Sequence, residues 1–215
     1  MAVSVKICGL DRSESVVAAV LGGTCFAGFV FYPPSPRNLS PDQAAILISA
    51  VPDTVAKVGL FVDPEDKDID AVLKAGKLDI IQLHGSETPV RVSAVKAHTG
   101  LPVMKVVPLA NKKDLQAAER YYPVADRLLF DAKPPSDMKK ALPGGNALSF
   151  DWQLLSDADI PLPWMLAGGL TPENLAEAVA ISGTDMVDVS SGVESAPGVK
   201  DVGKIQAFLQ AANSL

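Results

Sequence analysis

The sequence predicts a closed, parallel, eight-stranded (β/α)8 barrel, also called a TIM barrel. Short apolar runs alternate with amphipathic helical stretches along the whole chain of 215 residues. Eight such units have about 27 residues each, the size of one strand and one helix in a compact barrel. Because this alternation forms a parallel sheet with right-handed crossovers, we expect residues 1–215 to form a single domain.

Eight segments have the length and apolar character of buried parallel strands. They are Val3–Cys8, Cys25–Phe31, Ala56–Val62, Asp79–His84, Pro102–Val107, Arg127–Asp131, Pro163–Ala167 and Met186–Ser190. An open, doubly wound sheet is the structural alternative. It is disfavoured because Cys8-Gly9-Leu10, and no Gly-x-Gly-x-x-Gly, follows the first strand.

Helices are expected between these strands. Ser40-Pro41 and Thr171-Pro172 both have the pattern of an N-cap followed by proline at the first helical position. Glycines stand where four of the helices should end. They are Gly22, Gly76, Gly100 and Gly183.

The composition disfavours several classes of function. A net charge of −6 repels duplex nucleic acid and anionic membranes on average. Two cysteines, Cys8 and Cys25, do not make a disulfide framework in a chain of this length. We see neither a leader pattern nor an apolar run long enough to span a bilayer. We therefore expect a cytoplasmic monomer or homodimer that binds a small molecule, without nucleic-acid or membrane partners.

Active sites of such barrels lie at the carboxyl ends of the strands, so the strand positions predict the site. The candidates are Cys8, Arg37, Gln82, His84, Asp131, Gly168, Gly169, Asp188, Ser190, Ser191 and Gly192. Alternate strand residues share a face, so Lys6 should point inward with Cys8, and Asp188 with Ser190. The first and last strands are neighbours in a closed barrel, and Lys6 and Asp188 are therefore expected to form a buried ion pair.

The turns after strands seven and eight suggest a phosphate site. Gly168-Gly169 and Ser191-Gly192 place glycines where exposed backbone N–H groups hold phosphate in many barrels. Either turn alone would be explained equally well by tight packing between strand and helix. Both together favour phosphate binding.

Cys8 and Asp131 are the candidate acid/base pair. A thiolate can remove a carbon-bound proton if its pKa falls, and Lys6 is expected to lower that pKa. A protonated carboxyl group can donate a proton. Alternatively, Cys8 is a small buried hydrophobic residue and Asp131 caps a helix or forms a surface ion pair.

Four further features complete the expectations from the residues alone. Arg37, in a proline-rich loop, suits a carboxylate because guanidinium groups bind carboxylates bidentately. Cys25 is expected in the core and His98 on the surface. No His or Cys spacing indicates a metal site. The proline- and glycine-rich stretch 132–150 is long enough to be a functional loop that closes over a ligand, with a simple insertion as the alternative.

Taken together, these residues resemble the phosphoribosylanthranilate isomerase family over nearly the whole chain. The matching segments are Lys6-Ile7-Cys8-Gly9, Ser35-Pro36-Arg37, Gln82-Leu83-His84-Gly85, Asp131-Ala132-Lys133, Phe150-Asp151-Trp152, Leu166-Ala167-Gly168-Gly169-Leu170-Thr171-Pro172-Glu173-Asn174 and Val187-Asp188-Val189-Ser190-Ser191-Gly192-Val193-Glu194. Their order and spacing make the resemblance specific.

The resemblance implies an Amadori rearrangement in tryptophan biosynthesis, without a cofactor. Asp131 would be the general acid, Cys8 the general base, and Arg37 the ligand of the anthranilate carboxylate. One residue departs from the family pattern: Ala147 occupies a position that is usually glycine. Two alternatives stay open. One is the histidine-pathway isomerase that performs the same rearrangement, and the other is a catalytically silent barrel that binds a phosphosugar.

Overall fold

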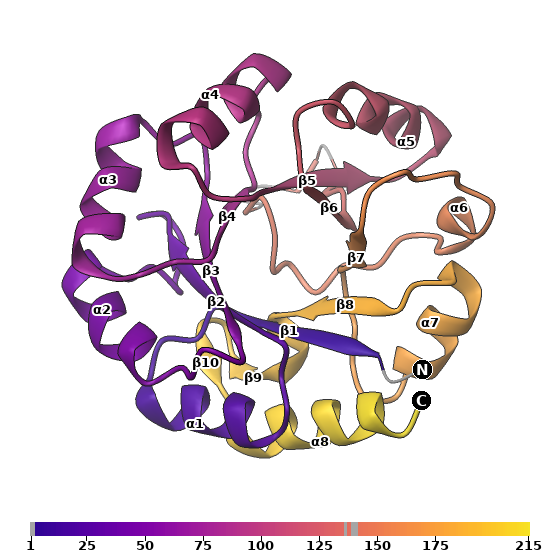
Figure 1. Cartoon of the computed structure of the whole chain (residues 1–215). Coiled ribbons are helices and arrows are strands. Elements are labelled where there is room, and N and C mark those ends of the chain that lie inside the picture. Colours follow the sequence, from indigo (N-terminus) through magenta and orange to yellow (C-terminus); the bar gives the residue numbers. More distant parts are fainter. Residues whose placement is uncertain (1–2, 136, 139–141) are drawn as a thin grey trace.

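Eight parallel strands close into a barrel in which each strand pairs with its neighbours in sequence and β1 pairs with β8 (Figure 1). This is a computed structural model, and it describes residues 3–135, 137–138 and 142–215. The barrel strands are β1 (Ser4–Cys8), β2 (Phe26–Phe31), β3 (Ala56–Phe61), β4 (Ile80–Leu83), β5 (Val103–Leu109), β6 (Arg127–Ala132), β7 (Trp164–Leu166) and β8 (Met186–Val189).

Helices surround the barrel and cover its outer face (Figure 1). They are α1 (Ser13–Leu21), α2 (Pro41–Ser49), α3 (Asp66–Ala75), α4 (Pro89–Thr99), α5 (Lys112–Ala118), α6 (Gln153–Ser156), α7 (Leu175–Ser182) and α8 (Val202–Asn213). Two short 3-10 turns, η1 (Glu119–Tyr121) and η2 (Ser191–Val193), follow α5 and β8. A small antiparallel pair, β9 (Glu194–Ala196) and β10 (Val199–Lys200), lies between η2 and α8.

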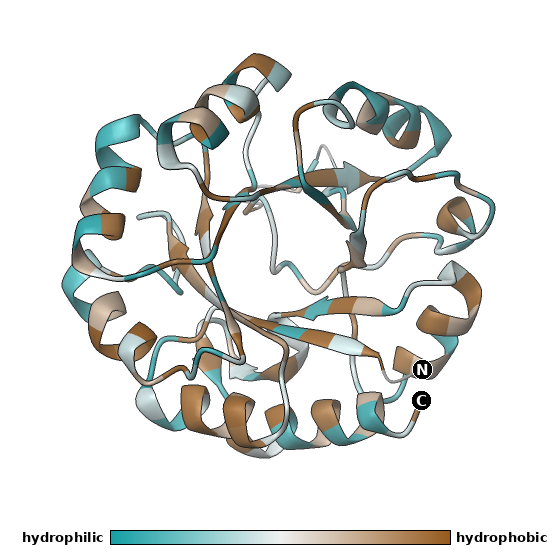
Figure 2. Cartoon of the chain, in the orientation of Figure 1, coloured by the Kyte–Doolittle hydropathy of each residue, from teal (hydrophilic) through white to brown (hydrophobic). Residues whose placement is uncertain are grey.

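The two largest parts of the hydrophobic core lie on opposite sides of the barrel wall. The larger part fills the space between strands and helices, and Ile7, Phe29 and Phe130 belong to it. The smaller part fills the barrel interior and includes Met104 and Leu129. Figure 2 shows the matching pattern of hydropathy, with hydrophobic residues along the strands and hydrophilic ones on the outer sides of the helices. The alternation of side chains along each strand separates the two parts.

The predicted strands are confirmed to within two residues at each end. The start of α2 is also confirmed: the Ser40 side chain accepts a hydrogen bond from the Gln43 N–H, and the Gln43 side chain accepts one from the Ser40 N–H. The four predicted helix-ending glycines are all C-caps. The predicted N-cap at Thr171 is wrong, because α7 begins only at Leu175 and Asn174 is its N-cap.

Cys25 is a second correction, since the structure places it on the surface and not in the core. It lies just before β2, and burial begins only within that strand, whose four central residues are buried. His98 is on the surface as expected, at the end of α4, where its ring contacts Asp70 at 2.7 Å.

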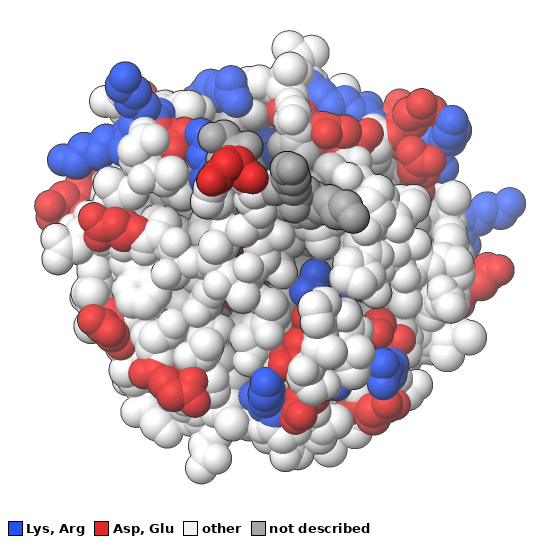
Figure 3. All heavy atoms as spheres, turned by 180° about the vertical axis from the view of Figure 1, so that it is seen from behind, with Lys and Arg blue, Asp and Glu red and all other residues white. Residues whose placement is uncertain are grey.

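Charged side chains on the face opposite to Figure 1 stand mostly around the rim, over the helices, and the middle of that face is largely uncharged (Figure 3). Within the described ranges no helix is both long and apolar enough to cross a bilayer.

Candidate active site

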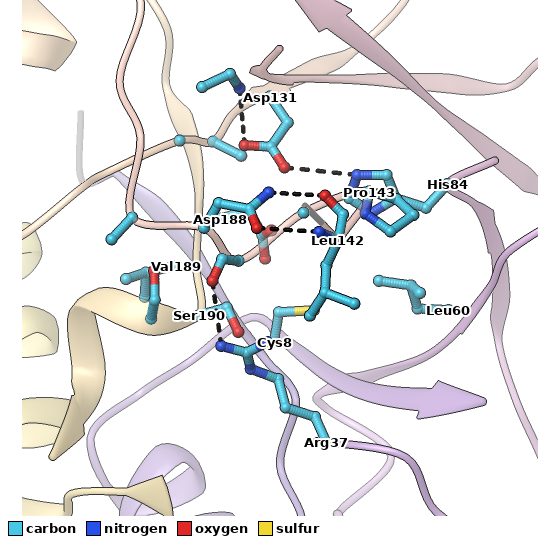
Figure 4. Close-up of a pocket in the computed structure, with 18 of the residues that line it drawn as sticks. Cys8, Arg37, Leu60, His84, Asp131, Leu142, Pro143, Asp188, Val189 and Ser190 are labelled. Atoms are coloured by element: carbon cyan, nitrogen blue, oxygen red, sulfur yellow. Dashed lines mark hydrogen bonds and ion pairs between the residues drawn. The ribbon is translucent and has the colours of Figure 1, made fainter. Parts of the chain in front are cut away.

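The eleven candidate residues line one pocket at the carboxyl ends of the strands (Figure 4). Its walls also contain residues that were not among these candidates. They are Val30, Tyr32, Ser35, Leu60, Val62, Ala132, Leu142, Pro143, Gly144, Gly145, Asn146, Ala147, Leu148, Ala167, Leu170 and Val189. The rule that places barrel active sites at strand ends therefore predicted the position of the pocket, and the loop residues completed it.

The predicted ion pair between Lys6 and Asp188 is confirmed. The two residues are register partners on β1 and β8, and Lys6 Nζ lies 2.9 Å from Asp188 Oδ1. The Lys6 side chain is fully buried and that of Asp188 is 9% exposed. Burial alone would lower the pKa of Lys6, but Asp188 and Cys8 outweigh it and the pKa is raised. Lys6 is therefore a fixed positive charge that contacts Asp188, which lines the pocket.

Cys8 packs in a small apolar cluster with Val30 and Leu60 directly above this ion pair. Burial raises the pKa of the Cys8 thiol, and Lys6 only partly offsets this effect because Asp188 opposes it. The expected direction of the Lys6 effect is therefore confirmed, but burial outweighs it and the pKa of Cys8 stays above its ordinary value in the free protein. Lys6 still reduces the free energy needed to form a thiolate during proton abstraction.

Asp131 is the last residue but one of β6, and it lines the pocket. Its Oδ1 accepts the Ala132 N–H at 2.8 Å, and its Oδ2 lies 3.5 Å from His84 Nε2. Both side chains are nearly buried, at 10% and 9% exposed. A Cβ atom on Gly144 would lie 2.7 Å from Asp131 Oδ2 and 2.5 Å from His84 Cε1. The β6–α6 loop therefore approaches the carboxylate at a glycine because no side chain fits there.

Gln82 is buried in the pocket without a partner. Neither its Nε2 nor its Oε1 has a hydrogen-bond partner among the described residues, and the residue is fully buried. A buried amide left unpaired costs about 1–3 kcal/mol, so such a group in a pocket indicates a ligand that pairs with it.

The two glycine turns pack against each other and against the β6–α6 loop. Gly168 and Gly169 have φ angles of 94° and 63°, in the left-handed region that favours glycine. No hydrogen bond within the described residues uses their N–H groups. The Asn174 side chain ties this turn to α7 by donating to the Gly169 carbonyl at 2.9 Å. The free N–H groups beside the pocket suit an anion such as phosphate.

Replacing Gly192 by alanine should destabilise this pair of turns. A Cβ atom at that position would overlap the carbonyl oxygen of Leu170, and neither backbone segment can move freely. We expect the free energy of unfolding to fall by about 1–3 kcal/mol, as for other overpacked sites, and phosphate affinity to fall with it. Denaturant unfolding and phosphate titration measure both, with Gly203→Ala on the exposed start of α8 as the control. Unchanged phosphate binding would contradict the role of the turn.

The β6–α6 loop (residues 133–152) borders the pocket through residues 142–148, so the interpretation as a functional loop is favoured over a simple insertion. Within it, Asn146 accepts from the Leu142 N–H and donates to the Leu142 carbonyl. Ala147 has a φ of 55°, and Gly145, two residues earlier, has a φ of 72°. Ala147 is therefore strained in a conformation that glycine adopts readily.

Ala147→Gly should raise the free energy of unfolding by about 1 kcal/mol, because relief of the left-handed strain exceeds the added entropy of the unfolded chain. Thermal and denaturant unfolding measure this. Ala110→Gly, at an exposed position without a positive φ, should instead lower stability. If both variants lost stability equally, strain at Ala147 would be ruled out.

Arg37 lies in the pocket wall, but its partner in this structure is an internal carboxylate. Its Nε and Nη2 donate to Glu194 at 2.7 and 2.8 Å. Lys200 Nζ donates to the same carboxylate at 2.6 Å. Sequence reasoning assigned no role to Glu194 or Lys200. Glu194 stood within a matching motif, whereas nothing in the sequence pointed to Lys200.

The fold and the pocket define a (β/α)8 barrel that combines glycine turns suited to phosphate with a thiol and a carboxyl group on non-neighbouring strands. Proton transfer to and from a small phosphorylated molecule is the chemistry such a site can perform. Across the described residues, no group of three or more His, Cys, Asp and Glu side chains is arranged to hold a metal ion.

Comparison with known proteins specifies the family. The model of the N-(5'-phosphoribosyl)anthranilate (PRA) isomerase family matches residues 5–211. The isomerase of that name from Paramagnetospirillum magneticum is 58% identical over 212 residues, covering 99% of this chain and 98% of the relative. The one from Paracoccus denitrificans is 58% identical over 214 residues, covering 100% and 99%. The chain belongs to the N-(5'-phosphoribosyl)anthranilate isomerase family.

Solved structures of phosphoribosyl anthranilate isomerases have a similar fold over nearly the whole chain. The crystal structure of phosphoribosyl anthranilate isomerase from Thermotoga maritima superposes with a TM-score of 0.87 at 36% identity, covering 99% of this chain and 100% of that one. A phosphoribosyl anthranilate isomerase in complex with reduced 1-(o-carboxyphenylamino)-1-deoxyribulose 5-phosphate gives 0.84 at 34% identity, covering 99% and 100%.

Proposed function

We propose that this protein converts N-(5'-phosphoribosyl)anthranilate to 1-(2-carboxyphenylamino)-1-deoxyribulose 5-phosphate in tryptophan biosynthesis. The observation that supports this most directly is the arrangement of Cys8 and Asp131 in one pocket, on strands that are not neighbours in the barrel (Figure 4). Each can therefore reach a different atom of a ligand held between them. Family membership specifies the reaction that such a pair performs.

The pocket has distinct regions for the two ends of this substrate. The glycine turns after β7 and β8 would hold the phosphate through backbone N–H groups. On the opposite side of the barrel, Val30, Leu60 and Val62 form an apolar wall that suits the anthranilate ring. Arg37 beside that wall would bind the carboxylate. The ribose would then lie between Cys8 and Asp131.

Two proton transfers by side chains, followed by a tautomerisation in which the proton of the C2 hydroxyl group moves to C1, complete the reaction. Asp131, in its protonated form, donates a proton to the ribose ring oxygen, and the C1–O bond breaks to give an open-chain Schiff base. Cys8, as the thiolate, removes the proton from C2, and the electron pair of that C–H bond moves to form the enolamine. The enolamine tautomerises to the ketone. Lys6 below Cys8 offsets the negative charge of the thiolate.

The unpaired groups in the pocket would bind the sugar hydroxyl groups. The Gln82 amide has both a donor and an acceptor free among the described residues, and His84 lies beside Asp131. Asp188 keeps one oxygen on Lys6, so its other oxygen can accept from a hydroxyl.

Turnover of freshly generated phosphoribosylanthranilate, followed as loss of anthranilate-type fluorescence, tests the proposal. We expect turnover by the purified protein. The same protein should be assayed with the phosphoribosylated substrate of the histidine-pathway isomerase. Activity on that substrate alone would favour the rival isomerase. A folded protein that binds phosphate yet converts neither substrate would be the silent phosphosugar-binding barrel.

The remaining expectations belong to the same proposal. We infer that residues 1–215 act as one cytoplasmic domain that needs no cofactor and binds neither nucleic acid nor membranes. A Thermotoga maritima phosphoribosylanthranilate isomerase is described as dimeric, with monomers generated from it, so a monomer and a homodimer are both compatible with this fold. Light scattering in solution distinguishes the two.

A further inference from the structure

A buried triad of alternating charge lies behind the pocket wall at Arg37. Glu194 Oε1 and Oε2 accept from Arg37 Nε and Nη2 at 2.7 and 2.8 Å. Lys200 Nζ donates to Glu194 Oε1 at 2.6 Å. The three side chains are 6%, 3% and 1% exposed. We call Arg37, Glu194 and Lys200 the charge triad.

Glu194 determines which edge of the Arg37 guanidinium is left for a ligand. The Nε–Nη2 edge is fully used by the bidentate contact with Glu194. The remaining edge consists of Nη1 and the second hydrogen of Nη2. Nη2 makes only a long contact of 3.4 Å to the Gly145 carbonyl, and a Cβ on Gly145 would lie 2.7 Å from Nη1. This free edge therefore points at the β6–α6 loop and the pocket, where Figure 4 shows Arg37.

Lys200 determines the net charge of the triad. Arg37 and Glu194 alone would be neutral as a pair and would attract an anion only weakly. With Lys200 the triad carries one excess positive charge in a buried position, where an uncompensated charge is costly. An anion at the free edge of Arg37 would compensate it. Burial lowers the pKa of Lys200 and Glu194 raises it, so the ammonium charge depends on an intact triad.

Lys200 also connects the triad to the turn after β8. Its Nζ donates to the Ser190 carbonyl at 3.0 Å and to Ser190 Oγ at 3.2 Å. Ser190 lines the pocket next to the proposed phosphate turn. Lys200, which supplies the excess positive charge, is thereby fixed to a strand end that lines the pocket.

We propose that Glu194 and Lys200 are positioning residues for recognition of the substrate carboxylate: Glu194 orients the free edge of Arg37 toward the ligand, and Lys200 keeps the triad positive. This inference rests on the proposed function, because it assigns the carboxylate end of that substrate. Neither residue touches the reacting atoms, so both act through Arg37.

Two variants change the charge of the triad in opposite directions. Together they distinguish orientation of Arg37 by Glu194 from simple attraction between the triad and an anionic ligand. Lys200→Met makes the triad neutral, and Glu194→Gln makes it doubly positive while releasing the bidentate contact. If both residues act as proposed, each variant should raise KM about tenfold or more, the range of a lost charge-assisted hydrogen bond, with a smaller change in kcat. Affinity for anthranilate alone, followed by its fluorescence, should fall in both.

The matched control is Lys204→Met, which removes an exposed lysine whose side chain makes one hydrogen bond among the described residues, to the Glu194 backbone carbonyl. It should leave KM at the parental value. Tighter anthranilate binding by Glu194→Gln would overturn the positioning role, and a parental KM for Lys200→Met would overturn the charge role. Equal loss of affinity for anthranilate and for inorganic phosphate, with a lower unfolding temperature, would show that the triad stabilises the fold and has no specific role in carboxylate recognition. A parent chain that binds anthranilate but does not turn over the substrate would refute the proposed function. The anthranilate affinities of the parent and the two triad variants would still test the roles of Glu194 and Lys200.

Discussion

Asp131→Asn should lower kcat by about 10²- to 10⁴-fold, the range that a positioned general acid contributes. The amide keeps the size and the hydrogen bond from the Ala132 N–H, but it has no proton to donate to the ribose ring oxygen. KM should change little because the phosphate turns and Arg37 remain. Steady-state kinetics on freshly generated substrate measure both constants.

Asp185→Asn is the matched control for this change. Asp185 is exposed at the start of β8, at the opposite end of the barrel, so the same substitution there should leave kcat at the parental value. Thermal unfolding should show that both variants fold. A folded Asp131→Asn variant with near-parental kcat would remove Asp131 from the mechanism, and His84 would then be the next candidate for proton donation.

Cys8→Ala should abolish turnover to a similar extent, by about 10²- to 10⁴-fold in kcat. No other group is expected to take its place, because Val30 and Leu60 form the rest of that wall and Lys6 is held as a cation by Asp188. Ligand affinity should persist, since the thiol is not among the groups proposed to hold the phosphate or the carboxylate.

The chain itself offers the control, because its second cysteine is exposed. Cys25→Ala should retain full activity, and thiol-modifying reagents that inactivate the parent should also inactivate this variant. Inactivation of the parent through Cys25 alone, or turnover by Cys8→Ala, would contradict the assignment of Cys8 as the base.

The position of the site followed from sequence reasoning because it depends on local patterns. Strand ends can be read from apolar runs and turn residues, and active sites of barrels lie at the carboxyl ends. The Lys6–Asp188 pair followed from the alternation of side chains along each strand and from the closure of the barrel between β1 and β8.

The wrong prediction of the start of α7 also has a physical reason. Thr171-Pro172 begins a turn that Asn174 closes by accepting the Thr171 N–H, so α7 starts later.

The sequence by itself determined the fold class, the set of strands and the eleven candidate residues at the strand ends of the pocket, because the spacing of apolar residues and the alternation of side chains along a strand are properties of neighbouring residues. Only the tertiary structure decided the charged partners and the pKa values of those residues. Glu194 reaches Arg37 across 157 positions of the chain, and Lys200 joins them from the β9–β10 hairpin. The raised pKa of Cys8 is the sum of burial by several strands against the charges of Lys6 and Asp188. Such sums depend on distances and solvent exclusion in the folded barrel, which no local pattern encodes.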